Sequence, residues 1–288
     1  MVYYLIFLSI LPILMGIVWI YSTKKYSKES IIASSKFFIM GVFLSVIVIF
    51  AEEFLLNVNN FTGYSNIIYI SFVVAGFTEE GFKALVLIPI LIKKKEFAKR
   101  VDGITYSVYL SLGFATVENL IYLLAEDHDI VFQVALNRAF ISIPAHIMFA
   151  IAMGYYLSKY KFCDSKKKKR KYLILSVLVP ILMHGTFDFI LMIQYRWAIV
   201  LFLLYVIILL KFNLEKLEKY IENSKKIFIS NMKKQRNIHI KKKMDEKSIK
   251  IEKEKSKIYD ESEKKWLLYS TLLYQYYIIG LIFFEKEV

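Results

Sequence analysis

Long apolar runs alternate with short polar segments along most of the chain. A helix of roughly 20 apolar residues crosses a bilayer core of about 30 Å at 1.5 Å per residue. Runs of about this length cover residues 2–21, 37–56, 67–92, 103–125, 130–158, 172–193 and 197–211, with an eighth candidate at 266–284. They are too long and continuous for barrel strands. The pattern therefore predicts an all-α, polytopic bundle of about seven or eight transmembrane helices.

The composition supports this fold class and divides the chain into parts. Of the 288 residues, 57% are hydrophobic, more than a soluble domain of this length would carry. The first run lacks a positive n-region and an A-x-A-like site, so we expect a membrane helix rather than a signal peptide. After residue 211 the chain becomes dense in Lys and Glu. We therefore predict a membrane domain at 1–211, a basic cytoplasmic helical or disordered tail at 212–265, and an extra transmembrane or interfacial helix at 266–288.

Lysine and arginine gather in alternate loops. Segments 22–36, 93–102 and 159–171 are rich in them, whereas 57–66 and 126–129 have none. By the positive-inside rule, the basic loops face the cytoplasm across a plasma membrane and the N-terminus lies outside. This topology accounts for most of the net charge of +14, so we expect no nucleic-acid partner. Anionic lipid is the expected partner of the basic loops and tail. The single cysteine, Cys163, indicates neither a disulfide framework nor a cysteine metal site.

Ionisable side chains stand inside four of the predicted helices. A charge at the bilayer centre costs a few kcal/mol, so such groups face the bundle interior and are functional candidates. They occur in the stretches "EEGFK", "FATVEN", "IPAH" and "HGTFD". The candidate site residues are Glu79, Glu80, Lys83, Glu118, Asn119, His146, His184 and Asp188.

Each group has a chemical and a structural interpretation. Lys83 is on the same helix face as Glu79 and can partly neutralise the two glutamates. The amide of Asn119 could donate to a developing oxyanion. Asp188, four residues after His184, is placed to orient its imidazole. Taken one at a time, each group could instead be an ion pair or a polar clamp between helices.

The candidates share one depth in the membrane. Counted from the basic edge of each helix, Glu79, His146 and His184 lie 13 or 14 residues in, about 20 Å at 1.5 Å per residue. Glu118 and Asp188 lie 17 or 18 residues in, about 26 Å. Polar groups with unrelated structural roles need not lie at the same depth in the membrane. The agreement favours a single buried site, displaced toward the outer face.

Three further charged residues carry weaker claims. Glu52 and Glu53 lie at comparable depth, close to the outer loop, where helix-end carboxylates reach water. We favour that interpretation over the alternative that they border the site. Arg138 lies nearer the outer face, where it could pair with a carboxylate or a lipid headgroup.

Glutamate, histidine and aspartate without a Ser or Cys nucleophile at the same depth suggest hydrolysis by activated water. In one mechanism His146, His184 and a carboxylate such as Glu118 bind Zn²⁺, and Glu79 or Glu80 deprotonates the water. In the other there is no metal, a glutamate activates water directly, and a histidine and the asparagine stabilise the oxyanion. The chain has no HExxH motif, and its residues do not decide between zinc and no cofactor.

Two other classes of function compete with hydrolysis. Buried Glu, Lys and His also build proton relays and ion pathways, so a transporter is the main alternative. A relay needs polar groups spread across the membrane thickness, whereas these groups cluster at one depth. A non-catalytic chaperone or immunity factor with a dead site would predict no effect of Glu79→Gln or Glu80→Gln.

Four stretches resemble, in order, the membrane motifs of the PrsW family of bacterial intramembrane proteases. They are "GFTEEGFK", "DGITYSVYLSLGFATVENLIYLL", "RAFISIPAHIMFAIAMGYYLSK" and "LVPILMHGTFDFIL". The resemblance covers roughly residues 1–211, and the family is distantly similar to CAAX-processing Abi proteases. By motif, Glu79, Glu80 and Lys83 match EExxK, Glu118 and Asn119 match FAxxEN, and His146 and His184 match the two histidines.

This resemblance implies a polytopic protease of the bacterial plasma membrane. It implies regulated proteolysis in a stress response, with a first cut in a single-pass membrane anti-sigma factor on the outer side. A second intramembrane protease would then release the sigma factor. The resemblance also implies that both glutamates of EExxK are essential, and it leaves the metal open.

Overall fold

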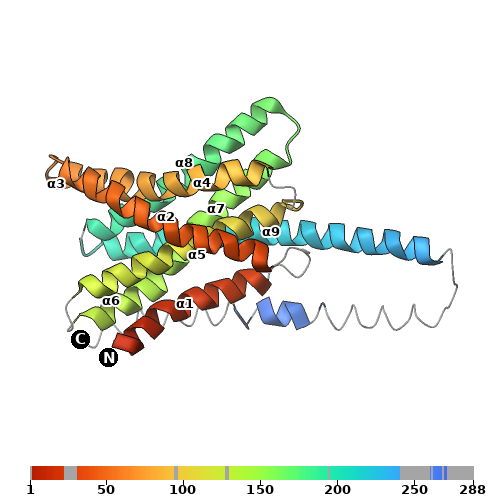
Figure 1. Ribbon diagram of the computed structural model, residues 1–288, viewed down its shortest axis with the longest axis horizontal. Helices are drawn as coiled ribbons and strands as arrows, with labels where there is room; N and C mark the ends of the chain where they lie inside the picture. Colours follow the sequence, from red (N-terminus) through yellow and green to blue (C-terminus); the bar gives the residue numbers. More distant parts are fainter. Residues whose placement is uncertain are drawn as a thin grey trace. The chain divides into compact units, whose positions relative to one another are not determined.

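The structure is a computed structural model that describes residues 2–22, 31–93, 97–126, 130–193, 195–240, 260, 262–267 and 269–270 (Figure 1). Most of the predicted helix at 266–284, and residues 241–259 of the predicted tail, lie outside the described residues. The chain divides into two compact units, Met1–Ile229 and Ser230–Val288. All that follows concerns the first unit, apart from the end of one long helix.

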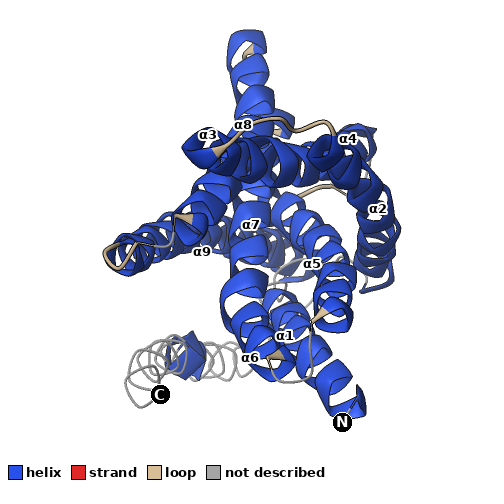
Figure 2. Ribbon diagram, turned by 90° about the vertical axis from the view of Figure 1, so that its left-hand side faces the viewer, coloured by secondary structure: helices blue, strands red, loops and turns tan. Residues whose placement is uncertain are grey.

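The described residues form helices, and no strand occurs among them (Figure 2). The elements are α1 (Val2–Ser22), α2 (Ile31–Asn57), α3 (Gly63–Ile68), η2 (Tyr69–Phe77), α4 (Thr78–Lys93), α5 (Arg100–Ala125), α6 (Val131–Asn137), η3 (Arg138–Ser142), α7 (Ile143–Lys161), α8 (Lys166–Met192) and α9 (Ala198–Ile240). Segments η2 and η3 are π-helical and join neighbouring α-helices without a loop.

Five described helices are long and apolar enough to cross a membrane. They are Ser34–Asn57, Arg100–Ala125, Val131–Lys161, Lys166–Met192 and Ala198–Lys233. The apolar stretch Ser9–Ser22 is shorter. The third predicted span lies in the continuous run from Gly63 to Lys93, which carries three charged residues in its interior. The predicted all-α polytopic bundle is confirmed, and its number of crossings depends on α1 and this run.

Helix α9 passes through residue 211 without a break. It runs from Ala198 to Ile240, and Leu217 and Tyr220 beyond that point are buried. The Tyr220 hydroxyl donates a hydrogen bond to the Tyr155 carbonyl at 3.1 Å, and the two rings stack with centroids 4.9 Å apart. An apolar stripe at helical spacing therefore continues into the Lys- and Glu-rich segment. The predicted domain boundaries stay predictions.

Glycines allow the central helices to cross at short distance. Helix α5 packs against α2 and α7. A Cβ atom on Gly113 of α5 would overlap the Phe38 carbonyl of α2, and one on Gly41 would overlap the α5 backbone. Gly103 of α5 and Gly154 of α7 form a second such crossing. Small residues at helix interfaces are typical of membrane proteins, because close backbone approach gains van der Waals contact.

Candidate functional site

A π-helical segment stands directly before two of the site helices. Segment η2 leads into Glu79, and the Thr78 hydroxyl donates to the carbonyl of Val73, five residues earlier, at 2.9 Å. Segment η3 leads into Pro144 and His146 at the start of α7. Wide turns of this kind occur often at functional sites. They change the direction in which the following side chains point, compared with an uninterrupted α-helix.

The glutamates of α4 share Lys83 but face different surroundings. The Lys83 Nζ atom lies 2.7 Å from Glu80 Oε1 and 3.0 Å from Glu79 Oε2. All three residues are buried. Glu79 lines a cavity, whereas Glu80 and Lys83 do not contribute to its wall. The EExxK motif therefore presents one carboxylate to the cavity and keeps the other behind it.

His146 is held between α4 and α5. Its Nε2 atom lies 2.9 Å from Glu118 Oε2, and its Nδ1 atom lies 3.4 Å from Lys83 Nζ and 4.0 Å from Glu79 Oε2. The backbone is fixed as well, because the Ser111 hydroxyl donates to the His146 carbonyl at 3.1 Å. The imidazole therefore links the Glu118 side of the site to Glu79.

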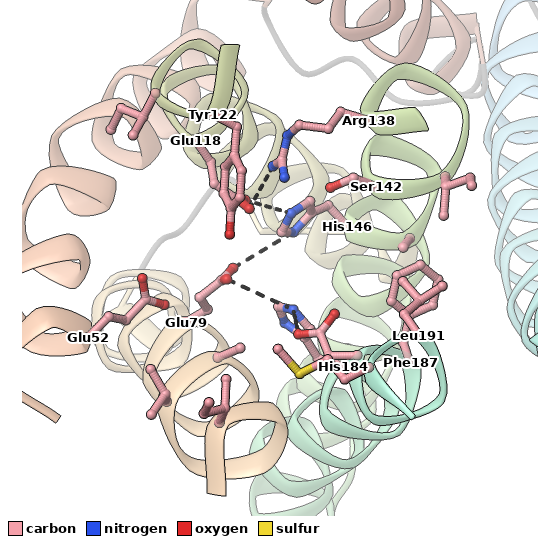
Figure 3. Close-up of a pocket in the computed structure, with 18 of the residues that line it drawn as sticks. Glu52, Glu79, Glu118, Tyr122, Arg138, Ser142, His146, His184, Phe187 and Leu191 are labelled. Carbon is pink, nitrogen blue, oxygen red and sulfur yellow. Dashed lines mark hydrogen bonds and ion pairs between the residues drawn. The ribbon is translucent and has the colours of Figure 1, made fainter. Parts of the chain in front are cut away.

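His184 approaches Glu79 from the other side (Figure 3). Its Nε2 atom lies 3.9 Å from Glu79 Oε1 and 3.2 Å from Asp188 Oδ2, as expected for an orienting aspartate. Its Nδ1 atom lies 3.4 Å from Glu80 Oε1, and its ring stacks on Phe149 at 4.8 Å. The next residue, Gly185, allows η2 to pack closely, because a Cβ atom at this position would overlap the Phe72 ring. Glu79 thus lies between the two histidines.

Arg138 contacts the site, although we ranked it below the other candidate residues. Its Nη2 atom donates to Glu118 Oε1 at 2.6 Å and its Nε atom to Asn119 Oδ1 at 2.8 Å. The guanidinium carbon lies 3.9 Å from the centre of the Tyr122 ring. One clue could have identified it: Arg138 precedes His146 by eight residues, close to two helical turns.

A cavity of about 750 Å³ lies against this cluster. Its polar wall contains Glu79, Glu118, His146, His184 and Asp188. Most of the remaining wall is apolar and comes from α2, η2, α5, η3, α7 and α8. The volume falls in the range of small-molecule and peptide side-chain pockets.

Three positions differ from what we favoured. Glu52 and Glu53 of α2 both line the cavity, so the less favoured alternative, that they border the site, describes their position. Asn119 is buried and does not line the cavity, and its Oδ1 accepts from Arg138. Its position gives no support for a direct contact with an oxyanion.

The site residues fit a divalent metal ion. Ligand atoms converge in two groups within 4.8 Å, one of Glu79, Glu80 and His184, the other of Glu79, Glu118 and His146. The buried atoms that lack a hydrogen-bond partner among the described residues include Glu80 Oε2, His184 Nδ1 and Glu118 Oε2. The last lies near His146 but not in hydrogen-bonding alignment. Histidine and carboxylate sets of this kind bind Zn²⁺.

The predicted ligand set differs from both groups. It joined the two histidines directly with Glu118, whereas the structure places Glu79 between them. Glu79 is the member that both groups share.

Known proteins match this chain across the whole site. Residues 29–212 match the family described as "PrsW family intramembrane metalloprotease". Protease PrsW of Clostridioides difficile (strain 630) is 59% identical over 81% of this chain and 98% of its own length. Protease PrsW of Bacillus subtilis (strain 168) is 34% identical over 70% of this chain and 88% of its own length.

The resemblance seen in the four membrane motifs is therefore confirmed. Every candidate site residue lies inside the matched range. No solved structure matches the chain. The chain belongs to the PrsW family of intramembrane metalloproteases and is a membrane-embedded protease.

Proposed function

We propose that this multi-pass protease hydrolyses a peptide bond of a single-pass membrane protein at the polar wall of the cavity, with Glu79 as the base that activates water. One observation carries the proposal. Glu79 lines the cavity, and its two oxygens lie 3.9 and 4.0 Å from the two histidines. A carboxylate in this position can take a proton from a water molecule in the cavity.

The chain's own groups account for the proton transfers. Glu79 takes a proton from water while the water oxygen attacks the carbonyl carbon of the peptide bond. His146 or His184 stabilises the charge that develops on the carbonyl oxygen. The C–N bond then breaks, and Glu79 returns the proton to the leaving nitrogen. One water is consumed, and one carboxyl group and one amine are formed.

The remaining polar groups hold these residues in place. Asp188 and Glu80 contact opposite edges of the His184 ring, and Glu118 contacts His146. Lys83 offsets the charge of both glutamates. Fixed neighbours of this kind reduce the reorganisation that the reaction requires.

We propose Zn²⁺ as the metal of this metalloprotease. Members of the two groups that share Glu79 would hold it. When bound, such an ion supplies Lewis acidity to water and to the peptide carbonyl.

We further propose a single-pass anti-sigma factor as the substrate, cut near the outer face of the bacterial plasma membrane. The cavity-lining residues Glu53 and Leu56 are near the end of α2, and Met192 is the last residue of α8. Both helices end next to loops that are poor in lysine, and the basic loops lie at their other ends. The positive-inside rule then puts the N-terminus and the cavity side outside, with the basic loops and tail on anionic lipid.

Transport is not favoured. Five ionisable side chains from α4, α5, α7 and α8 line one cavity: Glu79, Glu118, His146, His184 and Asp188. The family match points the same way, because the matched relatives are proteases.

The test is cleavage of a tagged single-pass anti-sigma factor from the same genome, co-expressed with the protease. Wild type would be compared with Glu79→Gln, Glu80→Gln, His146→Ala and His184→Ala at matched membrane levels. The control is Glu222→Gln, which alters an exposed glutamate paired with a lysine of the same helix. We expect wild type and the control to cut, and the four site variants to accumulate intact substrate.

Two results would count against the proposal. Equal cutting by the site variants would show that another site carries the reaction. Cutting of an unrelated tagged single-pass protein, with the anti-sigma factor left intact, would overturn the substrate and retain the protease site.

A further inference from the structure

We propose that Arg138 is a positioning residue for the reaction, which acts by fixing the Glu118 carboxylate against His146. This inference rests on the proposed function of the same cavity. The arginine comes from η3, whereas the glutamate comes from α5. Three residues within about one turn of α5 contact the one guanidinium group: Glu118, Asn119 and Tyr122.

The contacts divide the Glu118 carboxylate between two partners. Oε1 accepts a hydrogen bond from Arg138 Nη2 at 2.6 Å, and Oε2 lies 2.9 Å from His146 Nε2. The charge-assisted hydrogen bond from Arg138 is short and is therefore among the stronger ones in proteins. Because one oxygen is held by the guanidinium, the other is kept close to the imidazole. Without Arg138 the carboxylate could rotate about its terminal torsion, which is a soft one.

Arg138 is itself held in a single orientation. Asn119 Oδ1 accepts from its Nε atom at 2.8 Å, and the Tyr122 ring lies under the guanidinium at 3.9 Å. Asn119 is buried, and its amide oxygen serves as the acceptor that holds the guanidinium group. A planar guanidinium with donors in a fixed fork can satisfy a carboxylate and an amide at once, which an ammonium group cannot do in the same geometry. The asparagine therefore orients the arginine, and the arginine orients the glutamate.

The position of Glu118 also affects the surroundings of Glu79, the proposed base, because His146 lies between the two carboxylates. His146 meets Glu118 through Nε2 and faces Lys83 and Glu79 through Nδ1. A shift of Glu118 changes the position of the imidazole beside Glu79. Partners that orient a histidine in this way typically contribute 10–100-fold, by analogy with outer-shell groups of metal sites. Arg138 therefore acts on turnover more than on substrate binding.

The test uses purified full-length protease in lipid nanodiscs with the tagged anti-sigma factor as substrate. Arg138→Ala should lower kcat by about 10–100-fold and leave KM within about twofold. Arg138→Lys keeps the charge but not the fork, and should recover only part of kcat. Guanidinium chloride at non-denaturing concentration should raise kcat of Arg138→Ala by entering the vacated space. It should not raise kcat of wild type or of Glu118→Gln.

A second variant keeps the test decisive if Arg138→Ala does not fold. Tyr122→Leu removes the ring under the guanidinium but leaves the ion pair, and should lower kcat several-fold with the thermal midpoint close to that of wild type. A rise in KM with unchanged kcat would identify Arg138 as a substrate anchor and overturn the inference. A lowered midpoint with no rescue by guanidinium would reduce its role to folding and would also overturn it.

Failure of the inference and failure of the proposed function are distinguishable. Full activity of Glu79→Gln in the same assay would overturn the proposed function. Loss of activity in Glu79→Gln, together with wild-type kcat in Arg138→Ala, would overturn the inference alone.

Discussion

The Lys83 ammonium lies 2.7 Å from the Glu80 carboxylate, and neither side chain lines the cavity. Glu79 is the neighbour of this pair that does line it. Adjacent residues on one helix therefore have different tasks. Glu79 faces the cavity, where we propose that it activates water, whereas Glu80 pairs with the lysine and lies 3.4 Å from His184 Nδ1.

We expect Glu79→Gln and Glu80→Gln to fail in different ways. Loss of the base should lower kcat by about 10²–10⁴-fold, with a moderate fall in thermal midpoint because Lys83 keeps its shorter pair with Glu80. Glu80→Gln should lower kcat less, by roughly 10–100-fold, and should lower the midpoint more, because a fully buried carboxylate is removed from Lys83. Kinetics and thermal melts of both purified variants would check this. Equal midpoints with equal loss of kcat would contradict the division of tasks.

Lys83→Met should destabilise the protein. It leaves two buried carboxylates without their shared ammonium group, and breaking a buried ion pair typically costs about 3–5 kcal/mol. Lys226→Met is the matched control, because that lysine is exposed and pairs with one glutamate on the same helix. Thermal unfolding in nanodiscs would measure both variants. A midpoint for Lys83→Met as high as that of the control would mean that the carboxylates do not need the ammonium group.

Asp188→Asn should slow the reaction without unfolding the protein. The Asp188 carboxylate lies 3.2 Å from His184 Nε2, so the amide keeps the shape and loses the charge. We expect kcat to fall by about 10–100-fold. Asp164→Asn, in an exposed loop position, serves as the control in the same cleavage assay. Wild-type kcat in Asp188→Asn would show that His184 is oriented by Glu80 alone.

Gly113→Ala should weaken the packing of α5 on α2. The added Cβ atom would overlap the Phe38 carbonyl, and backbone atoms cannot move aside as a side chain can. Gly81→Ala is the control, because a Cβ atom there meets nothing within 4 Å. That change should be neutral or should stabilise its helix by ~0.5–1 kcal/mol. Thermal midpoints that fell equally in both variants would contradict the tight crossing.

Metal content should follow the two groups that share Glu79. We expect purified wild type to retain close to one divalent ion per chain, and Glu79→Gln to retain least, because both groups lose a ligand. Glu222→Gln should retain as much as wild type. Elemental analysis of dialysed samples would measure this without reference to activity. Equal metal in Glu79→Gln and wild type would exclude Glu79 as a ligand.

The sequence predicted the helices and the convergence of the site for simple physical reasons. Apolar length reports membrane crossing, and residue counts from the basic loops report depth. The counts for Glu79, His146 and His184 agreed, and the structure places both histidines within 4.0 Å of the Glu79 carboxylate. The depth of a residue in the membrane does not determine, however, in which direction its side chain points around the helix axis. Which histidine atom meets which carboxylate could not be predicted.

The sequence predicted one other contact in part: Arg138 was expected to pair with a carboxylate or a lipid headgroup, and the structure pairs it with Glu118. Arg138 was ranked low because its backbone lies toward the outer face, but its long side chain reaches Glu118 and Asn119. The predicted domain boundary at residue 211 stays a prediction, and α9 runs through that position without a break. Leu217 and Tyr220 keep α9 packed beyond that point.

The wide turns before Glu79 and before His146 carry a consequence for comparing relatives. Each holds one residue more per hydrogen-bonded ring than an α-helix does. Deleting one residue there would rewind the wide turn toward a regular α-helix, and would shift and rotate the residues on one side of it relative to those on the other. Glu79 would then turn away from both histidines while every motif stayed intact. A relative with a one-residue gap in either stretch would therefore keep the motif residues, but their side chains would point away from the site.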